Sequence, residues 1–285
     1  MHATQIAGDA ALHQLKLCFG RDRFQVARQD PPWKVVRAFA LPESGRLVHL
    51  HNVSGGVLAG DRLALDIEVE AGAGAQVTTT GATRLYRHRP GAVDSAQYST
   101  FSVGDGALLE FLPDPVIPYA ASRHAQRTEI RLGHGAALLW WEVLAPGRLA
   151  AGERFAFERL RVETSVYTPR RPIFLEDYVL EPERQDLRSP VRMLGYSHMA
   201  SFCAAQEGRP PEFWRNLERQ LSEIASAMTL PGRAVWGASA LASDGLLVRG
   251  LTTSGRFVND PLAEFWQAAR LAITGAKCPL PRKIS

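Results

Sequence analysis

The sequence predicts a mainly β protein built of stacked strand layers, of the β-helix or solenoid type, with two amphipathic helices toward the C-terminus. Three observations lead to this fold class. Apolar and polar residues alternate with a period of two from Trp33 to about Tyr178. A glycine-rich turn of the pattern G-x-G-A recurs within that span. Two later stretches repeat their apolar residues with helical spacing instead.

The recurring turn begins at Gly72, Gly104 and Gly133, so that a strand, a turn and a second strand repeat about every 30 residues. Regular recurrence of one such unit indicates stacked hairpins or a solenoid layer. Unrelated hairpins in a β-sandwich use the same turn chemistry, so a sandwich remains open as an alternative.

We interpret residues 1–285 as one domain, β-rich from 15 to 200. The stretch 50–63 places three glycines in a turn, and alternating apolar residues follow it, which predicts a turn that leads into a strand. It is not a phosphate-binding loop, because no Lys-Ser/Thr pair ends it and no helix opens after it.

The helices are predicted at about 210–229 and 260–274, on either side of a hairpin at 235–251. An Asp-Gly pair marks the hairpin turn. We expect Asp260 to cap the second helix and Pro261 to occupy its first helical position.

Composition limits the class of protein. No apolar run approaches the roughly 18 residues of a membrane span, and the chain does not open with a basic and then apolar leader. The cysteines, Cys18, Cys203 and Cys278, are odd in number and far apart, which disfavours disulfides and a CxxC zinc site. We therefore expect a cytoplasmic protein with no membrane contact.

The formal net charge is +4, and the basic residues are interleaved with acids. Nucleic-acid binders concentrate Lys and Arg and add aromatic residues between them. We therefore expect no nucleic acid partner, although a polyanion-binding β protein remains an alternative function.

Motifs for catalysis are scarce. The sequence has no H-E-x-x-H, no G-x-S-x-G, and no Walker lysine. His49 and His51 share one face of a strand, which would suit a metal ion, but an ordinary strand face explains them more simply. The sequence therefore offers none of these established catalytic motifs.

Four carboxylates stand out: Asp61 follows a glycine turn, Glu110 and Glu142 neighbour apolar strand residues, and Glu176 ends another apolar strand. Burying a carboxylate is costly unless it is paired or ligates a cation. Arginine partners would explain each of them. A hydrophilic passage through an apolar interior would explain them as well, since divalent cations accept carboxylate and water ligands. A carbohydrate-active β-fold enzyme that uses Glu110 and Glu142 as its catalytic pair is a further alternative.

Four blocks together resemble the urease accessory protein family D, also called H in some bacteria. The blocks are LHNVSGGVLAGDRL (50–63), GAQVTTTGATRLYR (74–87), LEFLPDPVIPY (109–119) and LGHGAALLWWEVLAPGRLAAGERF (132–155). The tail, LLVRGL (246–251) followed by a helix with Phe265 and Trp266, is also similar to that family's C-terminal region.

The resemblance implies a non-enzymatic scaffold. Proteins of this kind bind apo-urease and recruit the accessory proteins UreF and UreG for nickel insertion into the urease active site. UreG is a GTPase that carries nickel. A water-filled channel through the D protein is proposed to pass the metal, so the resemblance implies nickel(II) in transit and no tightly bound cofactor.

The resemblance also suggests site residues. It places Asp61, Glu142 and Glu176 along the nickel channel, with Thr83 and Tyr86 near them. We further expect the helix face around Phe265 and Trp266 to form part of a partner interface with UreF. A channel needs weak, transient ligands, because a tight Cys/His cluster would trap the ion.

Overall fold

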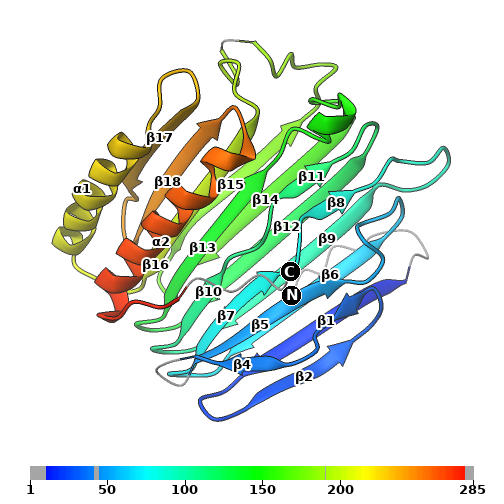
Figure 1. Ribbon diagram of the computed structural model, residues 1–285. Coiled ribbons are helices and arrows are strands. Elements are labelled where there is room, and N and C mark those ends of the chain that lie inside the picture. The colour runs from blue at the N-terminus through cyan, green and yellow to red at the C-terminus, as the bar shows by residue number, and fades with distance from the viewer. Residues whose placement is uncertain (1–10, 42–44, 190, 280–285) are drawn as a thin grey trace.

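The computed structural model describes residues 11–41, 45–189 and 191–279. The remaining residues of the predicted domain 1–285, its first ten and last six among them, lie outside this description. The described strands form a seven-stranded and an eleven-stranded sheet. Figure 1 shows the strands running side by side across the molecule, with both helices at one end. The mainly β class, the layered strands and the two helices are confirmed.

The smaller sheet has the strand order β15-β14-β12-β9-β6-β1-β2. Its strands are, in that order, Pro172–Leu180, Arg159–Tyr167, Arg123–Leu132, Ser95–Val103, Arg62–Val69, Leu12–Phe19 and Phe24–Gln29.

The larger sheet has the strand order β17-β18-β16-β13-β10-β7-β5-β3, with β4, β8 and β11 attached beside this path. The main strands are, in that order, Ala234–Ala240, Gly245–Thr252, His198–Gln206, Ala137–Leu144, Leu108–Phe111, Gly74–Thr79, Gly45–Asn52 and Trp33–Lys34. The attached strands are Ala38–Ala40, Thr83–Leu85 and Val116–Pro118.

From β5 to β14 the chain alternates between the sheets. Strands β6, β9, β12 and β14 pair in parallel in the smaller sheet, and β5, β7, β10 and β13 pair in parallel in the larger one. Leu109, for example, lies between Ala75 and Leu138. Each pass of the chain therefore stacks on the one before it, and residues in register share one face of the sheet.

The glycine turns stack as well, with one difference from the predicted repeat. The peptide N–H of Gly72 donates to Asp105 at 2.9 Å, and that of Gly106 donates to His134 at 2.8 Å. Gly72, Gly106 and Gly135 all have φ near +65°, which L side chains rarely adopt. In the structural repeat Gly72 therefore corresponds to Gly106. The sequence pattern aligned Gly72 with Gly104 instead, which is two residues earlier.

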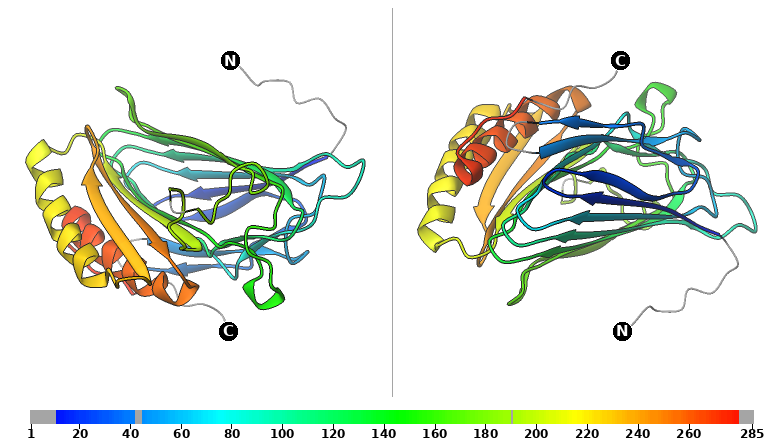
Figure 2. Two further views of the ribbon diagram at one scale, coloured as in Figure 1. Left: turned by 90° about the horizontal axis from the view of Figure 1, so that it is seen from above. Right: turned by 90° about the horizontal axis from the view of Figure 1, so that it is seen from below.

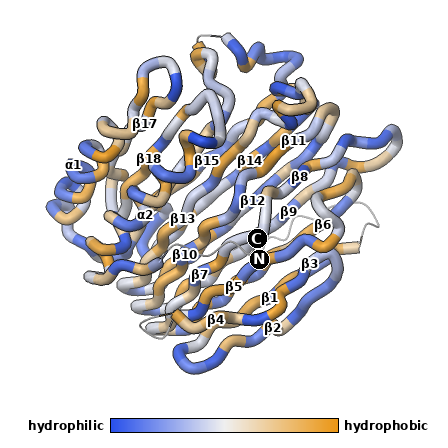
Figure 3. The backbone as a smooth tube through the Cα atoms, viewed as in Figure 1, coloured by the Kyte–Doolittle hydropathy of each residue, from blue (hydrophilic) through white to orange (hydrophobic). Residues whose placement is uncertain are grey.

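Strand alternation directs the apolar residues into the space between the sheets. Leu63, Leu65, Ile67 and Val69 are each at most 1% exposed, while Glu68, between them, is exposed. Figure 3 shows the same alternation of apolar and polar residues along the strands. Facing sheets pack about 10 Å apart, so one layer of side chains from each sheet fills this core.

Both helices cover the face of the larger sheet that points away from the smaller one (Figure 2). Helix α1 spans Pro211–Met228, with a proline at its start as expected. Helix α2 spans Asn259–Thr274 and is capped by Val258, so the expected N-cap at Asp260 is wrong. The preceding 3-10 turn, Gly255–Phe257, leads directly into α2, which starts the helix before the Asp-Pro pair.

A buried ion pair holds α2 on the sheet. Glu110 of β10 points toward α2, and its carboxylate lies 3.2 Å from Nε of Arg270. Nε1 of Trp266 donates to it at 2.8 Å, and Nε2 of Gln76 donates at 3.0 Å. Burial raises the pKa of Glu110, and these three partners oppose that shift. Glu110 and Arg270 are 2% and 4% exposed, so both charges are almost entirely withdrawn from bulk water.

Replacing Glu110 with alanine will destabilise the chain, because it removes the buried carboxylate that pairs with Arg270 and accepts the Trp266 hydrogen bond. We expect a loss of about 3–5 kcal/mol in the free energy of unfolding, measured by urea denaturation. Glu223→Ala, on the exposed side of α1, is the control and should change stability by no more than about 0.5 kcal/mol. Equal losses in the two variants would contradict this account of α2.

Candidate functional site

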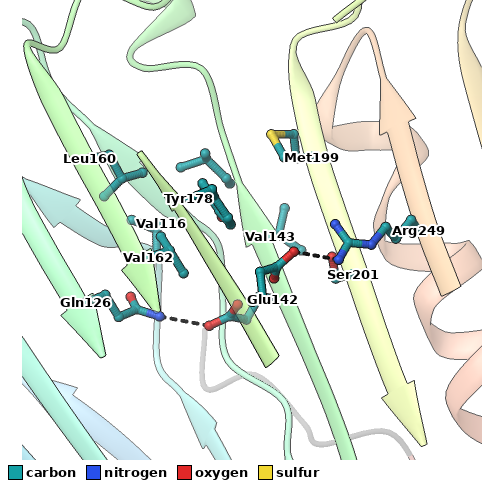
Figure 4. A pocket seen from close by; sticks show the side chains of 12 residues that line it. Val116, Gln126, Glu142, Val143, Leu160, Val162, Tyr178, Met199, Ser201 and Arg249 are labelled. Carbon is teal, nitrogen blue, oxygen red and sulfur yellow. Dashed lines mark hydrogen bonds and ion pairs between the residues drawn. The ribbon is translucent and has the colours of Figure 1, made fainter. Parts of the chain in front are cut away.

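A small pocket lies between the sheets where their apolar core ends. The smaller sheet contributes Gln126, Glu176 and Tyr178, and the larger sheet contributes Glu142 and Arg249 (Figure 4). The cavity volume is about 40 Å³, which is room for a few water molecules. The rest of the lining is Ser201 and the apolar residues Val116, Val143, Leu144, Leu160, Val162 and Met199.

The strand register explains why Glu142 points into this pocket. Leu138 and Trp140 of β13 enter the core between the sheets, and Glu142, two residues further, lies on the same face. Across the sheet, Glu142 pairs with Ser201 of β16, and Ser201 pairs with Arg249 of β18. Three strands thus place a polar row on the inner face of the larger sheet.

Glu142 is the most perturbed acid of the site. Its Oε1 accepts a hydrogen bond from Nε2 of Gln126 at 2.8 Å. Burial, and secondly the nearby Glu176 carboxylate, raise the pKa of Glu142 to about 8, and the Gln126 hydrogen bond opposes them only in part. Glu142 is therefore largely protonated at neutral pH when no cation is present.

Glu176 differs because it has a cationic partner. The Arg249 guanidinium forms an ion pair with it, and the Glu176 side chain is 13% exposed. Tyr178 lies two residues along the same strand and lines the same pocket. Burial, followed by the Glu142 and Glu176 charges, raises the pKa of the Tyr178 phenol. The pocket therefore holds two carboxylates and one guanidinium.

Thr83 and Tyr86 belong to a second region, beside the glycine-rich turn. Thr83 lines a cavity of about 220 Å³ together with Gly55 and Gly56. The Tyr86 hydroxyl donates to the Gly55 carbonyl at 3.4 Å. The Asp61 carboxylate accepts the Leu58 N–H at 2.8 Å, which closes the turn. Asp61 lies outside the linings of both cavities, so its observed contact is structural.

One strand connects the two regions. Val116 of β11 pairs with Thr83 of β8 on one side and with Leu144 of β13 on the other. Val116 and Leu144 both line the pocket that contains Glu142. The structure thus brings Glu142 and Glu176 together and places Thr83 one strand away from their pocket, while Asp61 stands apart.

The expected partner interface at Phe265 and Trp266 does not fit the structure. Both side chains are 0% exposed and pack in the core between α2 and the larger sheet. Trp266 also donates to Glu110. The apolar stripe of α2 is therefore an internal face, and these two side chains offer no surface to a partner.

Within the described part of the chain, no group of three or more His, Cys, Asp or Glu side chains is positioned to hold a metal ion. His49 is 4% exposed, and Nδ1 of His51 lies 3.4 Å from the Thr80 hydroxyl. The two histidines therefore belong to a packed strand face. Tight metal chelation has no site among these residues.

Sequence reasoning missed four polar members of the pocket: Gln126, Tyr178, Ser201 and Arg249. Arg249 gave the clearest signal, since it is a single charge within the apolar strand LLVRGL. Tyr178 could also have been found, because it lies two residues from Glu176 and so shares its strand face.

The structure argues against a glycosidase built on Glu110 and Glu142. Glu110 pairs with Leu139, which lies an odd number of residues from Glu142 along β13. The two carboxylates therefore point to opposite faces of the larger sheet. Glu110 is also engaged by Arg270 and Trp266. The pair cannot flank one glycosidic bond.

Comparison with known proteins identifies the family. The sequence profile of the family described as UreD urease accessory protein matches residues 8–284. The chain belongs to the UreD urease accessory protein family. It is 42% identical over 264 residues to the urease accessory protein UreD of Herpetosiphon aurantiacus, which covers 93% of this chain and 92% of that relative.

Other UreD relatives are more distant. Identity is 34% over 242 residues to the urease accessory protein UreD of Yersinia enterocolitica, with 81% of this chain and 72% of the relative covered. It is 30% over 230 residues to the urease accessory protein UreD 2 of Brucella abortus, with coverages of 79% and 74%. The resemblance inferred from the sequence is confirmed. Membership of an accessory-protein family agrees with the prediction that the chain is not an enzyme.

Among the residues that the structure describes, neither helix has the length and apolar character needed to cross a bilayer.

Glu142 will make the stability of the chain depend on pH. Its pKa is raised from 4.5 to about 8 in the folded chain. The resulting stabilisation is complete below the unfolded pKa and is lost as the pH rises through the folded pKa. Glu142→Gln stays neutral, so between pH 5 and pH 9 it should gain about 4 kcal/mol relative to the parent chain.

Urea denaturation at pH 5, 7 and 9 measures this difference. Asp177→Asn is the control, because Asp177 is exposed and its partner is Arg161. A constant difference between Glu142→Gln and the parent across this pH range would contradict the raised pKa.

Proposed function

We propose that this chain is a urease maturation scaffold that binds apo-urease and recruits UreF and UreG, and that nickel(II) passes between its sheets on the way to the urease active site. Nickel is cargo in this proposal, not a resident cofactor. We also propose that the protein works in the cytoplasm, without nucleic acid or membrane partners.

The observation that carries the nickel passage is the meeting of Glu142 and Glu176 across the two sheets. These carboxylates reach one small pocket from opposite layers of an otherwise apolar interior. Carboxylate and water oxygens bind a borderline divalent ion more weakly than thiolate or imidazole groups do. Two acids with room for a few waters would hold nickel briefly and then release it.

The second cavity supports a longer route. It lies beside the glycine-rich turn and is lined by backbone and by the polar residues Asn52, Thr79, Thr80, Thr83, Arg84 and Gln97. The β8–β11–β13 pairing connects its wall to the pocket of Glu142. We propose that a hydrated ion follows this line, with Thr83 and Tyr86 near its course.

The scaffold role has its support in the family and in the folding topology. Stacked parallel strands give long, rigid faces that do not need a ligand to form. Co-purification of the tagged chain with urease subunits, UreF and UreG from one expression host tests the partner assignment. Recovery of the chain alone under these conditions would contradict it.

Replacing both pocket acids will impair nickel delivery. We expect the double variant Glu142→Ala/Glu176→Ala to leave the complex with urease intact and to lower urease nickel content and activity by about tenfold or more, since no carboxylate remains in the pocket. Nickel is measured by elemental analysis of urease purified after co-expression under limiting nickel.

Asp177→Ala is the matched control. Asp177 neighbours Glu176 in β15 but is exposed on the outer face of the sheet. It should deliver nickel as the parent chain does. Full nickel loading by the double variant would contradict the passage, and loss of urease binding would show that the acids serve the interface or the fold instead.

A further inference from the structure

Arg249 occupies the boundary between the acidic pocket and a hollow outside it. The inner pocket contains Glu142 and Glu176. The outer hollow, of about 370 Å³, lies over β16, β18 and β17. Arg249, Met199 and Ser201 line both cavities. A cation that travels between the pocket and the hollow must therefore pass the Arg249 side chain.

The Arg249 guanidinium also competes with such a cation for the Glu176 carboxylate. It forms an ion pair with Glu176, whose side chain is 13% exposed, whereas that of Arg249 is 50% exposed. One end of the pair is thus fixed inside the pocket and the other is free to reach water. While the pair persists, one of the two pocket carboxylates is already neutralised.

The outer hollow offers the guanidinium a place to go. Gly237 of β17 lies directly opposite Arg249 in the sheet. A Cβ atom at Gly237 would have no heavy atom within 4 Å, so the space beside it is open. Among the described residues, those lining the hollow include no carboxylate or histidine that would bind the arginine or the metal ion there.

We propose that Arg249 is the gate and built-in counter-ion of the passage. In the metal-free chain its guanidinium forms an ion pair with the Glu176 carboxylate. A divalent cation reaches both carboxylates only when the guanidinium swings into the hollow beside Gly237. This inference rests on the proposed nickel passage and adds a means of controlling which ions enter it. The gate favours a divalent cation over a monovalent one, because a divalent cation can replace the guanidinium at Glu176 and also bind Glu142.

Removing the Arg249 charge will tighten nickel binding. The test uses the purified full-length chain and NiCl₂ alone, by equilibrium dialysis. Arg249→Gln keeps hydrogen-bonding groups near Glu176 but removes the competing charge, so we expect about tenfold tighter Ni²⁺ binding than in the parent. Arg249→Lys keeps the charge and should bind as the parent does. Arg161→Gln, on the outer face of the smaller sheet, is the control.

A second variant tests the gate without touching the ion pair. Gly237→Val fills the space into which the guanidinium withdraws, and a β-branched residue suits a strand. We expect it to fold as the parent does and to weaken Ni²⁺ binding by about threefold or more, because the open position of Arg249 becomes less populated.

The outcomes separate the gate from the passage. Unchanged or weaker Ni²⁺ binding by a folded Arg249→Gln would overturn the gate. If Arg249→Gln does not fold, unchanged binding by Gly237→Val overturns it. If one of these two results is found and the double variant Glu142→Ala/Glu176→Ala still loses nickel loading, only the gate is rejected. Normal nickel loading in the double variant rejects the passage itself.

Discussion

The stacking of in-register parallel strands is the constraint from which the rest of the structure follows. Successive strands alternate between two sheets, and each pairs with the strand one pass earlier. Residues in register must then point the same way, and every second residue enters the space between the sheets. Glycine turns with positive φ keep successive passes aligned. Apolar side chains fill the space because facing sheets leave no room for unpaired polar groups.

The candidate site arises where this constraint is relaxed. After β14 the chain turns antiparallel, and the larger sheet continues through β16, β18 and β17 beyond the edge strand of the smaller one, β15. At that boundary the paired residues on the inner face of the larger sheet are Glu142, Ser201 and Arg249, in place of apolar residues. Glu176 meets them from β15. On the opposite face of the same sheet, Glu110 is fully engaged by α2. One sheet therefore carries a structural carboxylate on one face and a carboxylate open to a cavity on the other.

Much of the fold could be predicted from the sequence, because period-two alternation and helical stripes are local patterns. The site could be predicted only in part. Glu142 and Glu176 were identified from their apolar strands and from the family resemblance, but their meeting across two sheets depends on packing that no local pattern encodes. Asp61 closes its own glycine turn, a local contact that the sequence pattern does not distinguish from a place along a passage, so its role in the channel stays a prediction. Phe265 and Trp266 were misjudged because an apolar stripe does not reveal what covers it, and here the larger sheet does.

The most direct test of the account is to locate a nickel ion in the chain. Crystals of the protein soaked in NiCl₂ and measured at the nickel absorption edge give the position of the metal without reference to urease activity. The account predicts an anomalous peak between the carboxylates of Glu142 and Glu176, with the Arg249 guanidinium turned toward Gly237. Nickel found only at surface histidines, with the Arg249–Glu176 pair unchanged, would contradict it.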